Sequence, residues 1–232
     1  VVIMGGVSTT GGDFEDVSPP PDRVGDLGYI TRLARASLRL GRLFDALGSH
    51  PYGGPYPPEQ DYRLDNSTTP VGLYFRRAEL QREAWHRVTG EWMPVWVTEF
   101  GWLTDWGLGC QWDTHPQGRT AQKVTEQQQA DYLVRAFRYA QEHWPWVGPM
   151  FIYNLDQAIG TPIDACDMNI ARYFSLIKPD GQESLAFTAL KWMDKPGIDC
   201  VMTASAPDEA SRETSLRYRA YLPTVLLLRA GC

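Results

Sequence analysis

The chain has 232 residues, a formal net charge of −6, 43% hydrophobic residues and 12% aromatic residues. This composition is typical of a globular protein and excludes a disordered tail, a collagen-like fibre and a disulfide-rich miniprotein. Asp and Glu (28) outnumber Lys and Arg (22), so the surface lacks the positive field that a nucleic acid or an anionic membrane requires. We therefore expect a neutral or cationic ligand and no nucleic acid. No apolar run approaches the roughly 20 residues that cross a bilayer, so we expect no membrane span.

The cysteines are spaced too widely for the paired motifs of a zinc site, and no nucleotide motif is present, so we expect no metal and no cofactor. Cys110, Cys166, Cys200 and Cys232 can form disulfides if the protein is exported. The sequon Asn66-Ser67-Thr68 is an acceptor only in a host that glycosylates. These features alone leave the cellular compartment open.

Short apolar, β-rich runs alternate with segments of helical period, which is the pattern of β–α units on a parallel sheet. Four units are expected, with strands at residues 1–4, 43–49, 95–98 and 150–155. The pair Pro196-Gly197 ends this pattern, so we predict one domain over residues 1–195 and a linker or tail over 196–232.

Each expected strand is followed by a segment with an apolar stripe at helical spacing. The first stripe runs from Leu27 to Leu38, the second ends before Gly90, and the fourth covers residues 186–193. Thr125 and Gln128 form a capping box at the start of the third helix, whose stripe reaches residue 137.

The spacing between successive expected strands is about 50–55 residues, above the roughly 31 per unit of a minimal eightfold barrel, so the connecting loops are enlarged. In such barrels the loops at the carboxyl ends of the strands carry the site. The polar and aromatic residues there are Ser8 and Thr9, His50 and Tyr52, Glu99 and Trp102, and Tyr153, Asn154 and Asp156. The later loops add Trp106, Trp112, Asp105 and Asp164 rather than glycine-rich phosphate turns. Flat aromatic faces beside carboxylates and amides favour a carbohydrate cleft.

Glu99 is the most informative residue in the chain. A strand alternates its side chains between two faces, so Glu99 is expected to share the face of Val95 and Val97, which in a closed barrel is the interior. A carboxylate at the mouth of a barrel costs desolvation energy unless donors surround it. Glu99 is therefore either functional or an ion-paired cap of the strand.

Four segments resemble a known family in the right order. Residues 93–102 (MPVWVTEFGW) resemble the seventh-strand nucleophile motif of glycoside hydrolase clan A, especially its cellulase-like and family 39-like members. Residues 43–53 (LFDALGSHPYG) resemble the sixth strand, and residues 144–155 (WPWVGPMFIYNL) the eighth. Residues 129–137 (QADYLVRAF) resemble the helix that precedes the eighth strand. The resemblance covers about residues 1–195.

The resemblance implies an α/β fold that is the C-terminal half, strands five to eight, of a (β/α)8 TIM barrel with enlarged loops at the strand C-terminal ends. It implies that Glu99 is the nucleophile of a retaining glycosidase acting on a carbohydrate substrate. Tyr153 stands where many relatives have a Trp platform under the reacting sugar. The expected substrate-binding residues are His50, Tyr52, Trp102, Tyr153, Asn154 and Asp156. Local packing remains an alternative role for His50, Tyr52 and Asn154, and at least one loop Trp is expected to lie in the loop core.

In this clan the acid/base belongs to an Asn-Glu sequence at the end of the fourth strand, and no such sequence occurs in this chain. We therefore expect an exported hydrolase, extracellular or at the cell surface, whose partner is a missing N-terminal barrel half, so that this chain alone is inactive. Two alternatives remain open. The chain could be a non-catalytic carbohydrate-binding half-barrel, or a half-barrel completed by a partner chain.

Two geometric predictions follow from the order of the strands. Glu99 should lie within hydrogen-bonding reach of His50, Tyr52 or Tyr153. Cys110 and Cys166 should approach one another, because both lie in long loops that follow neighbouring strands.

Overall fold

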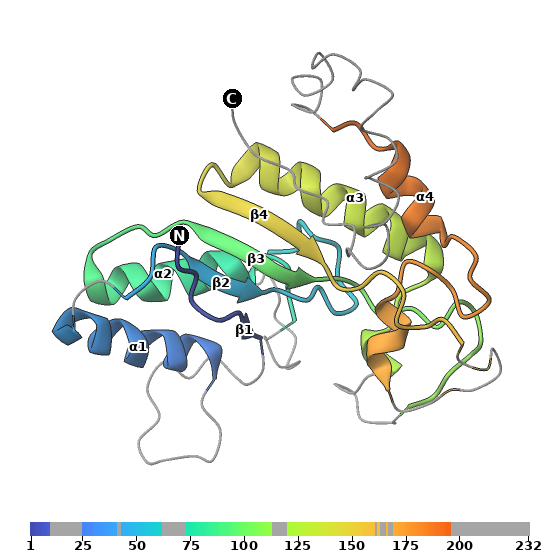
Figure 1. Cartoon of the computed structure of the whole chain (residues 1–232), viewed down its shortest axis with the longest axis horizontal. Helices are drawn as coiled ribbons and strands as arrows, with labels where there is room; N and C mark the ends of the chain where they lie inside the picture. Colours follow the sequence, from blue (N-terminus) through green and yellow to red (C-terminus); the bar gives the residue numbers. More distant parts are fainter. Residues whose placement is uncertain are drawn as a thin grey trace, which may run out of the picture.

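The computed structural model describes residues 1–9, 25–40, 43–61, 73–112, 120–160, 162, 166 and 169–195. Their order is β1 (Val7–Ser8), α1 (Asp26–Leu40), β2 (Leu47–His50), α2 (Arg77–Thr89), β3 (Val95–Phe100), α3 (Glu126–His143), β4 (Val147–Ile152) and α4 (Leu185–Trp192). Two short 3-10 helices, η2 (Thr120–Gln122) and η3 (Ile170–Phe174), lie in the long loops. The strands form one parallel sheet in the order β1-β2-β3-β4 (Figure 1). The expected α/β class with four β–α units is confirmed.

The expected strands at 43–49, 95–98 and 150–155 overlap β2, β3 and β4, although β2 begins at Leu47, β3 extends to Phe100 and β4 begins at Val147. The first strand differs more. Residues 1–4 contribute one isolated bridge, from Ile3 to Ala46, and the strand itself lies later, at β1. The predicted capping box of α3 is present, because Thr125 Oγ1 accepts from the Gln128 amide while Gln128 accepts from the Thr125 amide. The predicted stop of α2 is also present, at Gly90 in the left-handed conformation (φ 76°).

All four helices cover one face of the sheet. Consecutive parallel strands joined by right-handed crossovers place every helix on the same side. Helix α1 lies beside α2, and α3 lies beside α4 (Figure 1). The predicted stripe of α1 is buried at Leu27, Ile30 and Ala34, whereas Leu38 is exposed.

The core lies between the helices and this face of the sheet. One buried cluster joins α1 and α2 to Leu47 and Val95, and a second joins α2, α3 and α4 to Val97, Phe100 and Met150. Val95 and Val97 therefore face the helices. The expectation that they face the barrel interior was wrong.

A β-bulge in β3 separates Glu99 from these valines. Val97 pairs with Met150 and Phe100 with Ile152, so three steps along β3 match two along β4. The extra residue interrupts the alternation and lets Phe100 return to the helix side. As a result, Glu99 does not follow Val97 into the helix layer, and the strand-end carboxylate is left on the other side.

A buried polar network fixes β2 against α1 and α2. The Arg77 guanidinium donates to both oxygens of Asp26, at 3.0 and 2.8 Å, and Gln81 Nε2 donates to the same carboxylate at 2.8 Å. Ser49 Oγ donates to Gln81 Oε1 at 2.5 Å. Because Ser49 immediately precedes His50, this network sets the position of the carboxyl end of β2.

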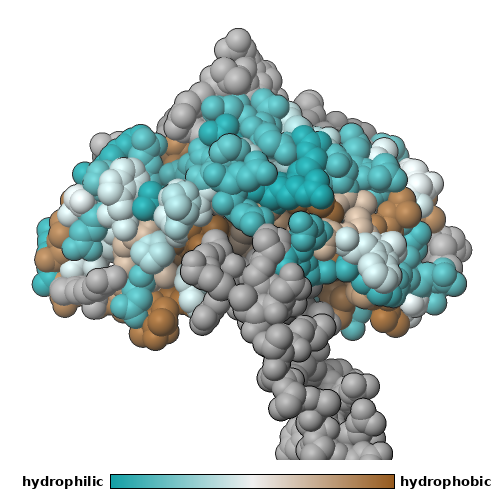
Figure 2. All heavy atoms as spheres, turned by 90° about the horizontal axis from the view of Figure 1, so that it is seen from above, coloured by the Kyte–Doolittle hydropathy of each residue, from teal (hydrophilic) through white to brown (hydrophobic). Residues whose placement is uncertain are grey.

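The exposed apolar side chains lie on different elements of the surface. In Figure 2 hydrophilic residues predominate over the centre of the face, and hydrophobic residues gather toward its lower margins. Large exposed apolar residues include Leu38 and Leu40 on α1 and Trp192 on α4. Among the described helices, none has the length and hydrophobicity of a membrane-spanning segment.

Candidate active site

Glu99 lies at the carboxyl end of β3 and accepts a short hydrogen bond from Tyr52. The Tyr52 hydroxyl donates to Glu99 Oε2 at 2.6 Å. Tyr52 follows β2, and the carboxyl ends of neighbouring parallel strands meet at one edge of the sheet. The Glu99 side chain is 36% exposed, so this carboxylate is both held and accessible. The predicted reach between Glu99 and a strand-end polar group is confirmed, although the bulge and not simple alternation brings it about.

His50 contacts the same carboxylate oxygen. Its Nδ1 lies 3.5 Å from Glu99 Oε2 and 3.3 Å from Ser8 Oγ, which comes from β1. Burial lowers the pKa of His50, although the neighbouring Glu99 carboxylate acts in the opposite direction. Burial and the hydrogen bond to Glu99 raise the pKa of Tyr52 well above its usual range. Near neutral pH the cluster thus holds a Tyr52 hydroxyl that donates and a neutral His50 ring.

The arrangement of Ser8, His50 and Glu99 does not match a serine-hydrolase triad. In a triad the serine and the acid contact opposite nitrogens of the imidazole. Here both contact Nδ1. The other nitrogen, Nε2, packs against Gly6, where an added Cβ would lie 1.9 Å away. The geometry therefore centres on the Glu99 carboxylate and not on a nucleophilic serine.

Gly6 is a site residue that the sequence did not single out. An added Cβ there would also lie 2.5 Å from Thr98 Oγ1, so only a glycine leaves room for the His50 ring beside β3. The pair Gly5-Gly6 just before β1 was the available signal, but it is equally typical of an ordinary turn.

Three aromatic rings form a wall beside the carboxylate. The ring centroids of Tyr52 and Tyr153 lie 6.0 Å apart, those of Tyr52 and Phe174 5.3 Å, and those of Tyr153 and Phe174 6.0 Å, all edge to face. Tyr153 follows β4, and Phe174 ends the 3-10 helix η3 in the next loop. Phe174 was missed, because a single aromatic residue in a long loop carries no periodic signal.

Two other residues after β4 have different environments. Asn154 is buried, and its amide binds the surrounding loop, donating to the Ala171 carbonyl at 2.7 Å and accepting from Ser175 Oγ at 2.7 Å. Asp156 is exposed. Of the two, Asp156 is therefore the side chain with access to solvent and a ligand.

Trp102 is placed in the core and not at the site. The side chain is 1% exposed, and its indole N–H donates to the Tyr56 carbonyl at 2.8 Å. Gly53 lies directly against the indole, which also packs near Phe75. The ring therefore has no exposed face for a sugar, and it supports the loop that carries Tyr52.

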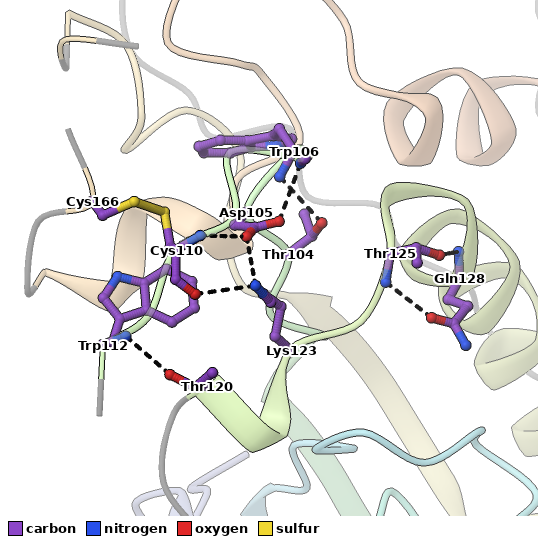
Figure 3. A network of polar contacts seen from close by, with 11 residues as sticks. Thr104, Asp105, Trp106, Cys110, Trp112, Thr120, Lys123, Thr125, Gln128 and Cys166 are labelled. Atoms are coloured by element: carbon purple, nitrogen blue, oxygen red, sulfur yellow. Dashed lines mark hydrogen bonds and ion pairs between the residues drawn. A yellow bond between two sulfur atoms is a disulfide. The ribbon is translucent and has the colours of Figure 1, made fainter. Parts of the chain in front are cut away.

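The loop after β3 is stapled by a disulfide. Cys110 and Cys166 are bonded, with Cα atoms 5.4 Å apart, which confirms the predicted pairing (Figure 3). Asp105 accepts from the amides of Gly107 and Cys110 and from Lys123 Nζ, at 3.1, 2.9 and 2.7 Å. Burial alone would raise the pKa of Asp105, but these donors hold it below its usual value.

The other two loop tryptophans belong to this stapled region. Trp106 and Trp112 pack against Tyr173, with ring centroids 5.2 and 4.8 Å apart. Trp112 is buried and Trp106 partly so. Both therefore pack the loop core. Asp164, the sequon at residues 66–68, Cys200, Cys232 and the tail over 196–232 lie outside the described residues.

In the described part of the chain, no cluster of three or more His, Cys, Asp or Glu side chains is placed to hold a metal ion. Searches with models of known protein families and against curated proteins found no match to this chain. The protein therefore has an α/β fold with a parallel sheet. At the carboxyl edge of this sheet lies a solvent-accessible carboxylate, Glu99, that is hydrogen-bonded to Tyr52.

Proposed function

We propose that this chain is the C-terminal half of a (β/α)8 barrel belonging to a retaining glycoside hydrolase, with Glu99 as its nucleophile. The observation that carries the proposal is the Glu99 carboxylate itself. It ends a parallel strand, stays accessible, and accepts a 2.6 Å hydrogen bond from Tyr52. Catalytic groups in parallel barrels lie at this end of the strands.

Several features of the fold support a barrel half. The strands run in sequential order with all helices on one face, as in a (β/α)8 barrel. Strands β1 and β4 form the two edges of the described sheet. The helices next to these edges, α1 and α4, expose Leu38, Leu40 and Trp192. A second half that adds strands and helices at both edges would cover such side chains.

The contacts of Glu99 suit nucleophilic attack. Tyr52 and His50 both contact Oε2, and no hydrogen bond to Oε1 is found within the described residues. We assign Oε1 as the oxygen that attacks the anomeric carbon, so that a glycosyl ester forms as the bond to the leaving oxygen breaks. Tyr52 and neutral His50 hold the other oxygen and fix the orientation of the carboxylate.

The mechanism also needs a carboxylic acid roughly 5 to 5.5 Å from the nucleophile to protonate the leaving oxygen. The contacts of Glu99 within the described residues are a phenol and an imidazole, not a second carboxyl group. We propose that the acid/base comes from the segment that completes the barrel. Water then hydrolyses the ester, with the same residue acting as base.

The ligand of this site is proposed to be a glycan. Tyr153 and its neighbours Tyr52 and Phe174 provide the aromatic surface, and Asp156 a solvent-exposed carboxylate for sugar hydroxyl groups. The disulfide supports an exported protein, since such bonds persist in oxidising compartments.

The test compares this chain with the same chain joined to the upstream segment of its own reading frame. Both are given an aryl glycoside and a natural oligosaccharide, and a fluorinated glycoside that traps the glycosyl-enzyme for mass spectrometry. The chain alone should show no turnover, because loss of general acid catalysis costs about 10²- to 10⁴-fold and the cleft is open. The longer protein should cleave both substrates and be labelled on Glu99.

The variant Glu99→Gln should abolish turnover and labelling, whereas Glu142→Gln, on the exposed part of α3, should change neither. If the chain alone hydrolyses the oligosaccharide, an acid within it, such as Asp156 or Asp105, is used and the half-barrel proposal fails. If the longer protein binds glycans and Glu99→Gln leaves any turnover unchanged, the binding-module alternative replaces it.

A further inference from the structure

Phe174 connects the aromatic wall to the rest of the loop after β4. Its ring packs edge to face on Tyr52, at 5.3 Å between centroids, and on Tyr153, at 6.0 Å. It also lies against the backbone just after β3, because a Cβ added at Gly101 would be 3.1 Å from Phe174 Cδ1. The ring thus fills the space between Tyr52, Tyr153 and the backbone at Gly101.

Tyr173, the residue before Phe174, packs against the disulfide-bonded loop and not against Tyr52. Tyr173 is buried against Trp106 and Trp112, in the loop that carries the disulfide. Its carbonyl accepts a hydrogen bond from the Thr104 amide at 3.0 Å. Cys166, earlier in the same loop, is bonded to Cys110. Two adjacent residues of η3 therefore join the stapled region on one side to the site on the other.

We propose that Phe174 is a positioning residue, which acts through the Tyr52 ring to keep the Tyr52 hydroxyl on Glu99 and is itself anchored by the Cys110–Cys166 loop. This inference rests on the proposed function only in treating Glu99 as the reacting group. The geometric claim concerns the hydrogen bond between Tyr52 and Glu99, which exists in this chain whether or not the chain turns over a substrate.

Shortening Phe174 should change the surroundings of the Glu99 carboxylate. If Phe174 is shortened, Tyr52 can rotate and water enters beside Glu99, so Oε2 loses its 2.6 Å donor. The same water reaches His50, which contacts this oxygen, and relieves part of the burial that lowers the pKa of His50. Among the described residues, Ser8 and Thr98 near the ring are neutral and Glu99 is the charged group in contact with His50.

The test measures the pKa of His50 by NMR, from the pH dependence of its imidazole C–H shifts, assigned with His50→Gln. Burial lowers this pKa in the parent chain. Phe174→Leu, which removes the ring but keeps an apolar side chain, should raise it toward that of an ordinary histidine. Phe174→Tyr, which keeps the ring, should titrate like the parent. The control Phe187→Leu makes the same substitution on α4, where the ring packs against the core cluster of α3 and α4, and should also titrate like the parent.

A second measurement needs no substitution. Reducing the disulfide of the parent chain releases the anchor of η3 and should raise the pKa of His50 in the same direction as Phe174→Leu. An unchanged His50 titration in Phe174→Leu, or an equal rise in Phe187→Leu, would overturn the positioning role. A failure of Glu99 labelling in the longer protein would instead overturn the proposed function and leave these titrations as they are.

Discussion

Removing the Cys110–Cys166 disulfide gives the largest stability change that the structure allows us to calculate. The bond joins residues 56 apart in sequence and encloses α3 and β4. In the chain-entropy model, closing a loop of this length restricts the unfolded state by about 4 kcal/mol at room temperature. The double variant Cys110→Ser and Cys166→Ser should therefore lose about that much free energy of unfolding, because the enclosed elements are otherwise unchanged.

Urea unfolding, followed by far-ultraviolet circular dichroism, measures this loss. With a slope of about 2–3 kcal/mol per molar urea, the midpoint should fall by about 1.3–2 M. A reducing agent provides the control, since it should lower the midpoint of the parent to that of the double variant and leave the variant unchanged. A loss below about 1 kcal/mol would show that the loop is held by its packing and not by the bond.

Three further results are expected. Gly6→Ala should displace the His50 ring, because the new Cβ would lie 1.9 Å from Nε2, and so shift the His50 C–H resonances; Gly5→Ala, where nothing lies within 4 Å of the added atom, should not. Thr125→Ala should lower the free energy of unfolding by about 1 kcal/mol in urea titrations, because the capping box of α3 is lost, and Thr125→Ser should restore it. Because burial lowers the pKa of His50 in the folded state, the unfolded chain takes up a proton first, so the folded state loses stability as pH falls below the ordinary value of 6.5. Urea midpoints measured across this range should depend less on pH in His50→Gln, and an equal dependence in both proteins would contradict the assignment.

The sequence predicted the features that depend on local spacing. Four β–α units, the capping box of α3 and the helix stop at Gly90 all follow from residue type and period, and the structure contains them. The approach of Cys110 and Cys166 followed from their places in long loops after neighbouring strands. Such features need no knowledge of which face a strand presents.

The orientation of β3 could not be predicted in this way. Apolar residues at alternate positions, here Val95 and Val97, fit the interior of a closed barrel and the helix-covered face equally well. The bulge between Val97 and Phe100 depends on the register with β4, which the sequence of one strand does not contain. The prediction for Glu99 thus contained two errors, the face assigned to Val95 and Val97 and the assumption of regular alternation. Together they left Glu99 on the correct face.

Which individual aromatic residues lie in the core was also beyond the sequence, although at least one loop Trp was expected there. Trp102 and Tyr153 both follow strand ends, yet the Tyr56 carbonyl and Gly53 draw Trp102 into the core. Both partners come from the loop after β2, about 50 residues away along the chain, and only the folded arrangement brings them to the indole.

The direction of the Glu99 carboxylate depends on the extra residue that forms the bulge in β3. Without the bulge, regular alternation of the same sequence would place Glu99 on the helix-covered face of Val97 and turn Phe100 out of the core. A designer who transfers this cluster to another parallel sheet therefore has to transfer the extra residue of the bulge along with Glu99, Tyr52 and His50. Val97 and Phe100, three residues apart, both stay in the core only because of this extra residue, and Glu99 then reaches Tyr52 and His50 on the other face.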